Sequence, residues 1–509
     1  MSDKDTSSNI AIDVAYVNTE AYEQFTKSEQ EKLKLMGTTE PRRLLMMFSR
    51  HAISGMCTNA LYLVIDSLVL SQKYPFQQSA VAFSLPISVY GPTAISLLCG
   101  MGVNHGLSQC LGKRDFINAR KFLMAAFQLA IVFWAIYCAI FIPCAKPVLK
   151  LLGCPEELME YALSYTKIMI YGSICSILSQ TISNALRALG QARASGESLA
   201  LGILCAIIIE PCLIYCTDLA NKGAAAAYVI GHAVAVLIGF SFFVMKGKRA
   251  AIVRFSLQRM FFFYPKHYAH ICLYGMGSFF SNFATGLSAG ITNHLITSHS
   301  KVYYETATIS ATLGSASSLI FLFFAACIGV DTAIMACGTF AVSAGLKRRA
   351  RSIFLNGLIL NTLIMLFGIG LLLCLSTVTP YIFYGGHSSV DHTYRTYMEK
   401  MNLILLPGRL LVGPLISTFA MLSAINRPIL SAVLSSSRKL FYFIPIIYII
   451  ESQYSKPLPL ICAYPTADIC AAVTAIIVII AMRKEFFFTK EGKTGRLNIA
   501  DLEEQDSKI

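Results

Sequence analysis

Long apolar runs recur along the chain, separated by short polar stretches. A bilayer core of about 30 Å needs roughly 20 apolar residues in a helix. These runs are too long for membrane strands, which would also alternate apolar and polar residues. The pattern therefore predicts an all-α polytopic membrane protein with twelve transmembrane helices. Their predicted bounds are 44–70, 79–101, 120–144, 160–181, 196–216, 223–245, 270–297, 307–332, 352–377, 395–423, 428–450 and 457–482.

The composition agrees with this class and excludes others. Of the 509 residues 55% are hydrophobic and 14% are charged, whereas an ordinary soluble domain carries about 25% charged residues. A soluble enzyme, a disordered chain and a disulfide scaffold are therefore excluded. Most of the sixteen cysteines lie in apolar runs and none form a CxxC pair, so we expect no metal site and no cofactor.

The basic residues predict which side of the membrane each loop faces. Lys and Arg total 42 against 28 Asp and Glu, a net charge of +14. In a membrane protein this excess indicates basic cytoplasmic loops rather than nucleic-acid binding. The alternate loops that carry most of these bases, such as 246–269 and 347–351, are therefore predicted to be cytoplasmic, as are both termini. The chain is expected in the plasma membrane or the membrane of an internal compartment.

The second half of the chain echoes the first. Gly102-Val103 recurs as Gly329-Val330, and the stretch 184–195 recurs as 420–431. An even number of helices in each copy gives both copies the same orientation, so we expect two pseudo-symmetric six-helix bundles with a central cleft. The predicted order is a cytoplasmic tail 1–43, a bundle 44–245, a basic cytoplasmic linker 246–269, a bundle 270–482 and a cytoplasmic tail 483–509. The linker could instead lie on the membrane as an amphipathic, lipid-sensing helix.

Ionisable side chains inside spans are costly and are functional candidates. Asp66, Lys167 and Glu210 each lie roughly 8–11 Å inside the outer ends of their predicted spans, at 1.5 Å per residue. Two carboxylates in one poorly hydrated layer cannot both ionise cheaply, which is the basis of a cation-coupling site. Tyr62 is one turn before Asp66 and could donate to it. Lys167 is either a permanent counterion or part of a structural ion pair.

The second half has different candidates. The repeat places Asn293 where Asp66 lies in the first half. Arg409 and Asp468 lie at similar depth, and we expect a buried structural pair, with substrate contact as the alternative. Arg438 and Lys439 are interpreted as solvated residues near a cytoplasmic end. Asn293, Arg409 and Asp468 are thus the candidate cavity residues of this half.

The sequence offers no enzyme or nucleotide site. Gly106–Arg114 has the wrong spacing for a phosphate-binding loop and ends in Arg where Ser or Thr should bind magnesium. The spans contain no nucleophile, base and orienting group in a recognisable set. We therefore predict neither an enzyme nor a pump driven by ATP within this chain.

Several short motifs, taken in order, resemble one family over roughly 44–482. They are Tyr62–Asp66, the loop Gly102–Arg120, Leu152-Gly153, Arg187–Gly190, Glu210-Pro211, Arg438 followed by Pro445, and Pro465–Asp468. The chain resembles the multidrug and toxin extrusion (MATE) family of the multidrug/oligosaccharidyl-lipid/polysaccharide exporter superfamily. The resemblance implies twelve helices in a V-shaped pair of bundles and export of organic cations in exchange for protons or sodium.

The resemblance also assigns roles to residues. It implies coupling by Asp66 and Glu210, which match acids of many members. Such members also use an Asn one turn before the second acid and a Thr in span 6, where this chain has Ala206 and Tyr228. Because two oxygen ligands suited to sodium are altered while both acids remain, we expect protons (H+) rather than sodium (Na+) as the coupling ion.

The sequence therefore predicts a monomeric antiporter in the lipid bilayer. It would export small organic substrates such as organic cations, drugs, toxins or metabolites in exchange for protons, by alternating access. One alternative within the superfamily is a flippase for a lipid-linked or anionic substrate, to which Arg409 and Lys167 would bind. A channel is the alternative from another class, although paired acids and duplicated bundles argue against it.

Overall fold

The computed structural model of the protein describes residues 36, 39–113, 115–217, 219–245, 253, 255, 258–299, 303–383, 389–454 and 458–482. This described part is helical and contains no strand, which confirms the predicted all-α class. Most of the predicted tails, 1–43 and 483–509, and ten positions of the linker 246–269 lie outside the described residues. The expectations for those segments therefore stay predictions.

Helices follow one another through both halves of the chain. The first half contains α3 (Pro41–Lys73), α4 (Pro75–Leu85), η1 (Pro86–Tyr90), α5 (Gly91–Lys113), α6 (Phe116–Leu151), α7 (Glu156–Ala188), α8 (Ala192–Cys216) and α9 (Ala220–Val244). The linker contributes η2 (Gln258–Phe261). The second half contains α10 (Pro265–His299), α11 (Tyr303–Ser343), α12 (Lys347–Cys374), α13 (Thr379–Phe383), α14 (Ser389–Arg409), α15 (Val412–Ala424), α16 (Pro428–Ser436), η3 (Ser437–Tyr442), α17 (Phe443–Gln453), η4 (Leu458–Cys462) and α18 (Ala463–Ala481).

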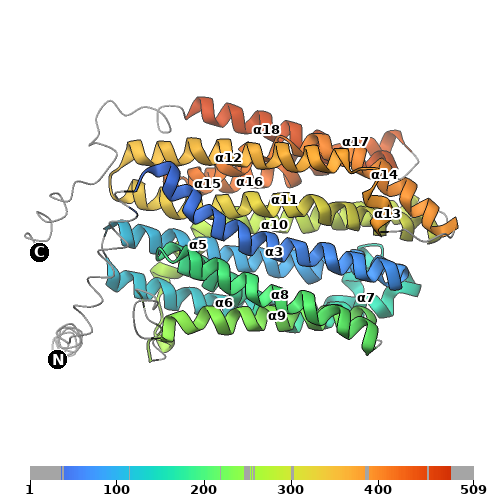
Figure 1. Ribbon diagram of the computed structural model, residues 1–509, viewed down its shortest axis with the longest axis horizontal. Helices are drawn as coiled ribbons and strands as arrows, with labels where there is room; N and C mark the ends of the chain where they lie inside the picture. The colour runs from blue at the N-terminus through green and yellow to red at the C-terminus, as the bar shows by residue number, and fades with distance from the viewer. Residues whose placement is uncertain are drawn as a thin grey trace, which may run out of the picture.

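These helices account for the predicted membrane crossings. Nine continuous segments of the described chain are long and apolar enough to span a membrane, and α14 with α15 forms a tenth, bent one. Helices α7 and α10 are too polar to be among these ten, but with 33 and 35 residues they are longer than a bilayer core requires and match the other two predicted crossings. The protein is thus an integral multi-pass membrane protein. The start of α3 and the end of α18 lie at the same end of the molecule (Figure 1).

Three crossings depart from the continuous α-helices that the sequence predicts. The segment predicted over 79–101 contains the π-helical turn η1, and the one over 428–450 contains the π-helical turn η3. The segment predicted over 395–423 breaks between α14 and α15 with a bend of 44°. Pro86 and Pro407 lie at two of these sites, where proline removes a backbone donor and disturbs the helical ladder. Irregular turns of this kind often lie at functional sites.

The internal repeat is visible in the backbone. Gly190 and Asn426, which are 236 residues apart, both follow a helix end with positive φ angles of 79° and 63°. The amide of Gln191 donates to the carbonyl of Leu186, and that of Arg427 to Leu422, each at 2.9 Å. This is the left-handed helix ending with its returning hydrogen bond. The structure therefore supports the duplication that the sequence echo predicts.

The two halves meet where their helices cross closely. A Cβ atom on Gly102 of α5 would lie 2.2 Å from the carbonyl oxygen of Ile271 in α10. A Cβ on Gly329 of α11 would lie 2.8 Å from the amide nitrogen of Ile53 in α3. Glycine is needed at both positions because any side chain would meet backbone. The two repeat-related glycines thus hold α5 against α10 and α11 against α3.

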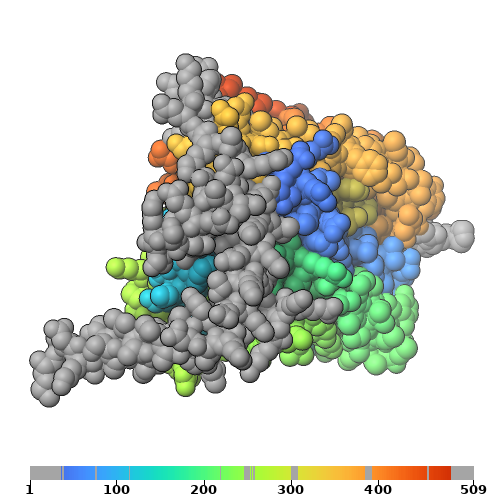
Figure 2. Space-filling model, turned by 60° about the vertical axis from the view of Figure 1, so that its left-hand side comes forward, coloured from blue at the N-terminus to red at the C-terminus, as the bar shows by residue number. Residues whose placement is uncertain are grey.

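The apolar core joins the halves at one end. Its largest cluster combines residues from both halves, including Leu44 and Leu107 of the first and Val330 and Ile353 of the second. Another large cluster lies within the second half, and two more consist of buried residues of the first half. Figure 2 shows α3, in blue, between the green segments of the first half and the orange segments of the second. The halves are therefore packed together most extensively at the end where α3 begins.

Candidate functional site

The carboxyl groups of Asp66 and Glu210 meet inside the first half. Asp66 lies on α3 and Glu210 on α8, and these two helices pack against each other. Asp66 is 6% exposed and Glu210 is fully buried. The two carboxyl groups are close enough to act on each other electrostatically, although neither oxygen of Glu210 has a hydrogen-bond partner in the described part of the chain. Because two neighbouring carboxylates repel each other in a poorly hydrated site, this arrangement favours a proton on one of the two groups.

The pair has tyrosine neighbours but little hydrogen-bond support. Tyr62 and Tyr165 are buried beside it. The hydroxyl of Tyr62 donates to the carbonyl of Ala224 in α9 at 2.9 Å, so its one proton is not directed to Asp66 as expected. Neither oxygen of Glu210 has a hydrogen-bond donor in the described part of the chain. The described residues therefore give the buried Glu210 carboxyl group no hydrogen-bond compensation.

Lys167 does not serve as their counterion in this structure. It is exposed, whereas its neighbours Tyr165, Thr166 and Met169 on α7 are buried. Successive residues in an α-helix are rotated by about 100°, so Lys167 points roughly 160° away from Tyr165, the neighbour that faces the acids. The sequence predicts Lys167 at the same depth in the membrane as the acids. Because its side chain points away from them, the expected ion pair with an acid is not formed in this structure.

A cavity of about 120 Å³ lies between the halves and is lined mainly by the second half. The first half contributes Ala82, Leu85 and Tyr90, and the second half contributes helices α10, α11 and α12 and the irregular segments around Arg409 and η3. Asn293 lines this cavity, and its side-chain amide donates to the carbonyl of Ala82 at 3.4 Å. Both π-helical turns border the space, through Tyr90 in η1 and Arg438 in η3.

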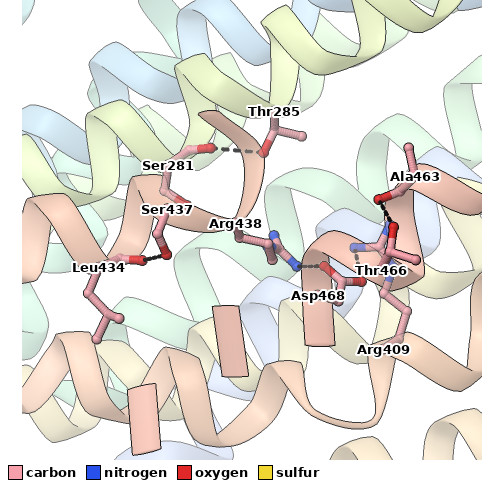
Figure 3. A network of polar contacts seen from close by, with 9 residues as sticks. All are labelled: Ser281, Thr285, Arg409, Leu434, Ser437, Arg438, Ala463, Thr466 and Asp468. Carbon is pink, nitrogen blue, oxygen red and sulfur yellow. Dashed lines mark hydrogen bonds and ion pairs between the residues drawn. The ribbon is translucent and has the colours of Figure 1, made fainter. Parts of the chain in front are cut away.

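A cluster of charged residues forms one wall of the cavity. Arg409 and Arg438 both approach Asp468, with nitrogen–oxygen distances of 3.4 and 3.6 Å. Figure 3 shows the two guanidinium groups converging on this carboxylate from different segments. Arg409 and Asp468 thus form the pair that the sequence suggests, while Arg409 also lines the cavity. Lys439 completes the cluster, with its ammonium 4.2 Å from the ring centre of Tyr464.

Arg438 and Lys439 correct the sequence interpretation most strongly. They were expected to be solvated, yet they are 5% and 4% exposed and line the cavity. The crossing that carries them begins at Pro428. Residues ten and eleven positions along a helix lie roughly 15 Å from its start, about half the bilayer core. That depth could have been worked out from the sequence and would have identified both residues as candidates.

Polar contacts connect the acid pair to a wall of the cavity. Ser67 follows Asp66, and its hydroxyl lies 3.0 Å from that of Ser315 on α11. The side-chain amide of Gln78 donates to the hydroxyl of Ser67 at 2.8 Å. Gly314, beside Ser315, lines the cavity. Asp66 is therefore next in sequence to Ser67, which makes a contact between the two halves.

The described residues contain no group of three His, Cys, Asp or Glu side chains suited to a metal ion.

Comparison with known proteins agrees with this architecture. The MatE family model matches residues 52–212. A protein of Shewanella oneidensis named FAD transporter is 23% identical over 222 residues, which are 43% of this chain and 49% of that protein. The chain therefore spans about half the length of this relative in the match.

Solved structures extend the likeness to almost the whole chain. One is described as a transporter of the MOP superfamily from Pyrococcus furiosus with reverse polarity of the binding pocket. It has a TM-score of 0.77 and 19% identity, covering 90% of this chain and 99% of that one.

Structures described as outward-facing and inward-facing conformations of a multidrug resistance MATE family transporter have TM-scores of 0.75 and 0.70. Both are 19% identical, and they cover 89% and 83% of this chain and 98% and 95% of those chains. At these identities the likeness shows the fold. The MatE family model thus matches residues 52–212, and over most of its length the chain has the fold of solved transporters described as MATE family members.

Proposed function

We propose that this protein is a secondary transporter that exports a small organic molecule in exchange for protons. The observation that supports the proposal most directly is the buried carboxyl pair of Asp66 and Glu210, two acids close enough to act on each other's charge. A site that holds a proton when closed and loses it when hydrated is the element that an antiporter requires. The pair is the proton-binding site in this proposal.

The environment of the pair favours protons over sodium. Sodium needs several oxygen ligands, whereas a proton needs one acceptor. Ala206 offers no side-chain oxygen, and Tyr62 donates its hydroxyl to a backbone carbonyl. Neither carboxyl oxygen of Glu210 has a donor in the described structure. Loss of a proton bound by this pair would leave two repelling carboxylates in a poorly hydrated layer. The charge change would therefore alter how α3 packs.

Alternating access would follow from separation of the halves. They share a core and two glycine crossings at the end where α3 begins, which the basic loops predict to be cytoplasmic. The contact of Ser67 with Ser315 connects the acid-bearing helix to α11 of the other half. Solved relatives of this fold are described in outward-facing and inward-facing conformations. We infer that protonation biases the same opening and closing in this chain.

The names of similar proteins include cargo of different chemistry. One relative is named a FAD transporter, and FAD carries two phosphates, while others are named multidrug export proteins. Export of organic cations, the cytoplasmic location of the termini and a monomeric state remain predictions for this chain. The charges on the cavity wall bear more directly on its cargo than these names do.

Efflux from proteoliposomes tests the proposal. Full-length protein is reconstituted with either ethidium, a cationic dye, or radiolabelled benzoate inside, and proton and sodium gradients are imposed separately. We expect a proton gradient to drive efflux of at least one probe, and Asp66→Asn and Glu210→Gln to abolish that dependence. Arg193→Gln, which removes an exposed ion pair with Glu197, is the control and should keep it. Efflux driven only by sodium, or proton-driven efflux from Asp66→Asn equal to the native rate, would contradict the proposal.

A further inference from the structure

The wall of the central cavity carries an excess of positive charge. Its charged lining residues are Arg409, Arg438 and Lys439, and no acidic side chain lines it in the described part of the chain. The nearest acid is Asp468, which is 1% exposed behind this wall and is shared by the two arginines. Three cations against one anion leave a net charge of two among these largely buried side chains.

The positive charge of Lys439 is the least compensated of the three. Lys439 is 4% exposed, and the charged groups that act on it are Arg409, Arg438 and Asp468. Within the described residues no carboxylate and no hydrogen-bond acceptor contacts its ammonium. A buried charge normally has a partner, because leaving it unpaired costs several kcal/mol. The uncompensated charge of Lys439 makes an anion the ligand that this wall of the cavity favours.

Arg438 also has a donor without a hydrogen-bond partner in the described part of the chain. It is 5% exposed, and its Nη1 makes no hydrogen bond, since its 3.6 Å approach to Asp468 is too long for one. A guanidinium presents parallel donors that match the two oxygens of a carboxylate or phosphate. Arg438 and Lys439 are adjacent on the π-helical turn η3 and both face the cavity. Together they form a compact oxyanion site.

The aromatic rings of the cavity are already in contact with the protein's own cations. Lys439 lies over the rings of Tyr464 and Phe443, at 4.2 and 5.4 Å from their centres. The guanidinium of Arg438 lies 5.3 Å from the centre of Phe324. Arg409 shares the ring of Tyr464 at 5.7 Å. A cationic substrate would have to displace these groups to gain cation–π contacts, so the cavity is poorly suited to one.

The rest of the lining accommodates an organic body. Leu313, Ile320 and Phe321 provide apolar surface on α11, and Asn282 and Ser288 provide hydrogen-bonding groups on α10. The cavity of about 120 Å³ is of the same order as the roughly 150 Å³ cavity that holds benzene in another protein, which is a volume suited to a small aromatic acid. Its chemistry therefore combines one oxyanion site with a mostly apolar pocket.

We propose that this cavity binds an organic anion, with the carboxylate or phosphate of the ligand held by Arg438, Lys439 and Arg409. As a binding site the proposal stands on the cavity itself, and only its use for export rests on the proposed function. The oxyanion can belong to a soluble molecule or to a lipid headgroup, since both carry the same chemistry.

Binding of an isosteric series tests the charge preference. Benzoate, benzamide and benzamidine have nearly the same shape and are negative, neutral and positive. We expect calorimetry on purified full-length protein to give tightest binding for benzoate and weakest for benzamidine. Loss of one charge-assisted contact should weaken benzoate binding by roughly 10- to 100-fold, so Lys439→Met and Arg438→Gln should each do so. Equal or tighter binding of benzamidine by the native protein would overturn the proposal.

Matched variants separate binding from folding. Lys439→Arg keeps the charge and should retain benzoate binding within a few-fold, whereas Lys439→Met should lose it. Arg193→Gln removes an exposed cation far from the cavity in sequence and should behave as the native protein does. Benzamide binding by each variant reports whether the pocket is intact. If Lys439→Met and Arg438→Gln bind benzoate as tightly as the native protein, the cavity is not the anion site.

The source of the oxyanion and the proposed function are tested separately. Nanodiscs of phosphatidylcholine alone are compared with nanodiscs that also contain phosphatidylglycerol. If phosphatidylglycerol competes with benzoate, the ligand is a lipid headgroup. If phosphatidylglycerol does not compete and phenyl phosphate binds tightly, the ligand is a soluble anion. Both support an anion site. If benzoate binds in a Lys439-dependent way but is not moved by a proton gradient, the proposed function fails and the site stands. If only ethidium is moved and benzoate does not bind, the proton proposal stands and the anion site fails.

Discussion

Replacing Gly102 by alanine should force the two halves apart at the end where they are packed together. The new Cβ would lie 2.2 Å from the carbonyl oxygen of Ile271, and ordinary contact begins at 3.4 Å. The helices α5 and α10 would have to separate by about 1 Å, because both contacting parts are backbone or rigidly attached to it. A side chain cannot rotate away to relieve this clash.

The magnitude follows from the cost of overpacking. Extra atoms in a packed interior destabilise by roughly 1–3 kcal/mol, and here only the state in which the halves touch is affected. The equilibrium should therefore shift by about 5- to 140-fold toward the state that is open at this end. The gain in helix propensity from Gly to Ala occurs in both states and cancels.

Alkylation of a native cysteine measures the shift. Cys99 is fully buried on α5, three residues before Gly102, whereas Cys374 is exposed. Peptide mass spectrometry gives the rate of N-ethylmaleimide labelling at Cys99 relative to Cys374, which reports the population of the open state. The rate should rise in Gly102→Ala and stay unchanged in Gly370→Ala, a control at which a Cβ meets nothing within 4 Å. An unchanged rate in a folded Gly102→Ala protein would refute the reasoning.

Three further substitutions have defined outcomes. Lys167→Gln should leave proton-driven efflux unchanged in proteoliposomes, because the side chain is exposed; loss of proton dependence would mean that the lysine does act on the acids. Tyr62→Phe should lower the unfolding free energy by about 1 kcal/mol through loss of the hydrogen bond to Ala224, with proton dependence retained, as thermal unfolding and efflux would measure. Arg187→Ala should destabilise by about 2–5 kcal/mol in thermal unfolding, because the fully buried guanidinium donates to Ser195 and to two further side chains; an unchanged transition would contradict its structural role.

Depth along a helix could be predicted from the sequence, and direction around the helix could not. Counting residues from the outer ends placed Asp66, Glu210 and Lys167 in one layer. The structure brings the two acids together because α3 and α8 pack face to face. Lys167 shares the depth but points outward, since its helix buries Tyr165 and Met169 instead. Facing depends on which neighbours a helix packs against, and that is a property of the whole fold.

The irregular turns account for most of the other differences between the sequence prediction and the structure. The apolar pattern of a span does not distinguish an α-turn from a π-turn, so η1 and η3 were predicted as plain helix. Pro407 and Gly408 in the sequence indicate an irregularity near Arg409. A proline inside a membrane helix often only kinks the helix, however, so these residues do not by themselves predict a break. Arg438 and Lys439 were overlooked because they were assigned to a helix end. Their depth in the span would have identified them, whereas the cavity they line needed the assembled structure.

The acid pair and the basic wall lie on separate residues, and the pair is absent from the lining of the cavity. Proton and cargo would then occupy different atoms, so a ternary complex with both bound is sterically allowed. Exchange would depend on the mechanical link through α3 and α11 rather than on direct displacement. In kinetic terms, saturating cargo would lower the maximal rate of proton uptake without acting as its competitive inhibitor.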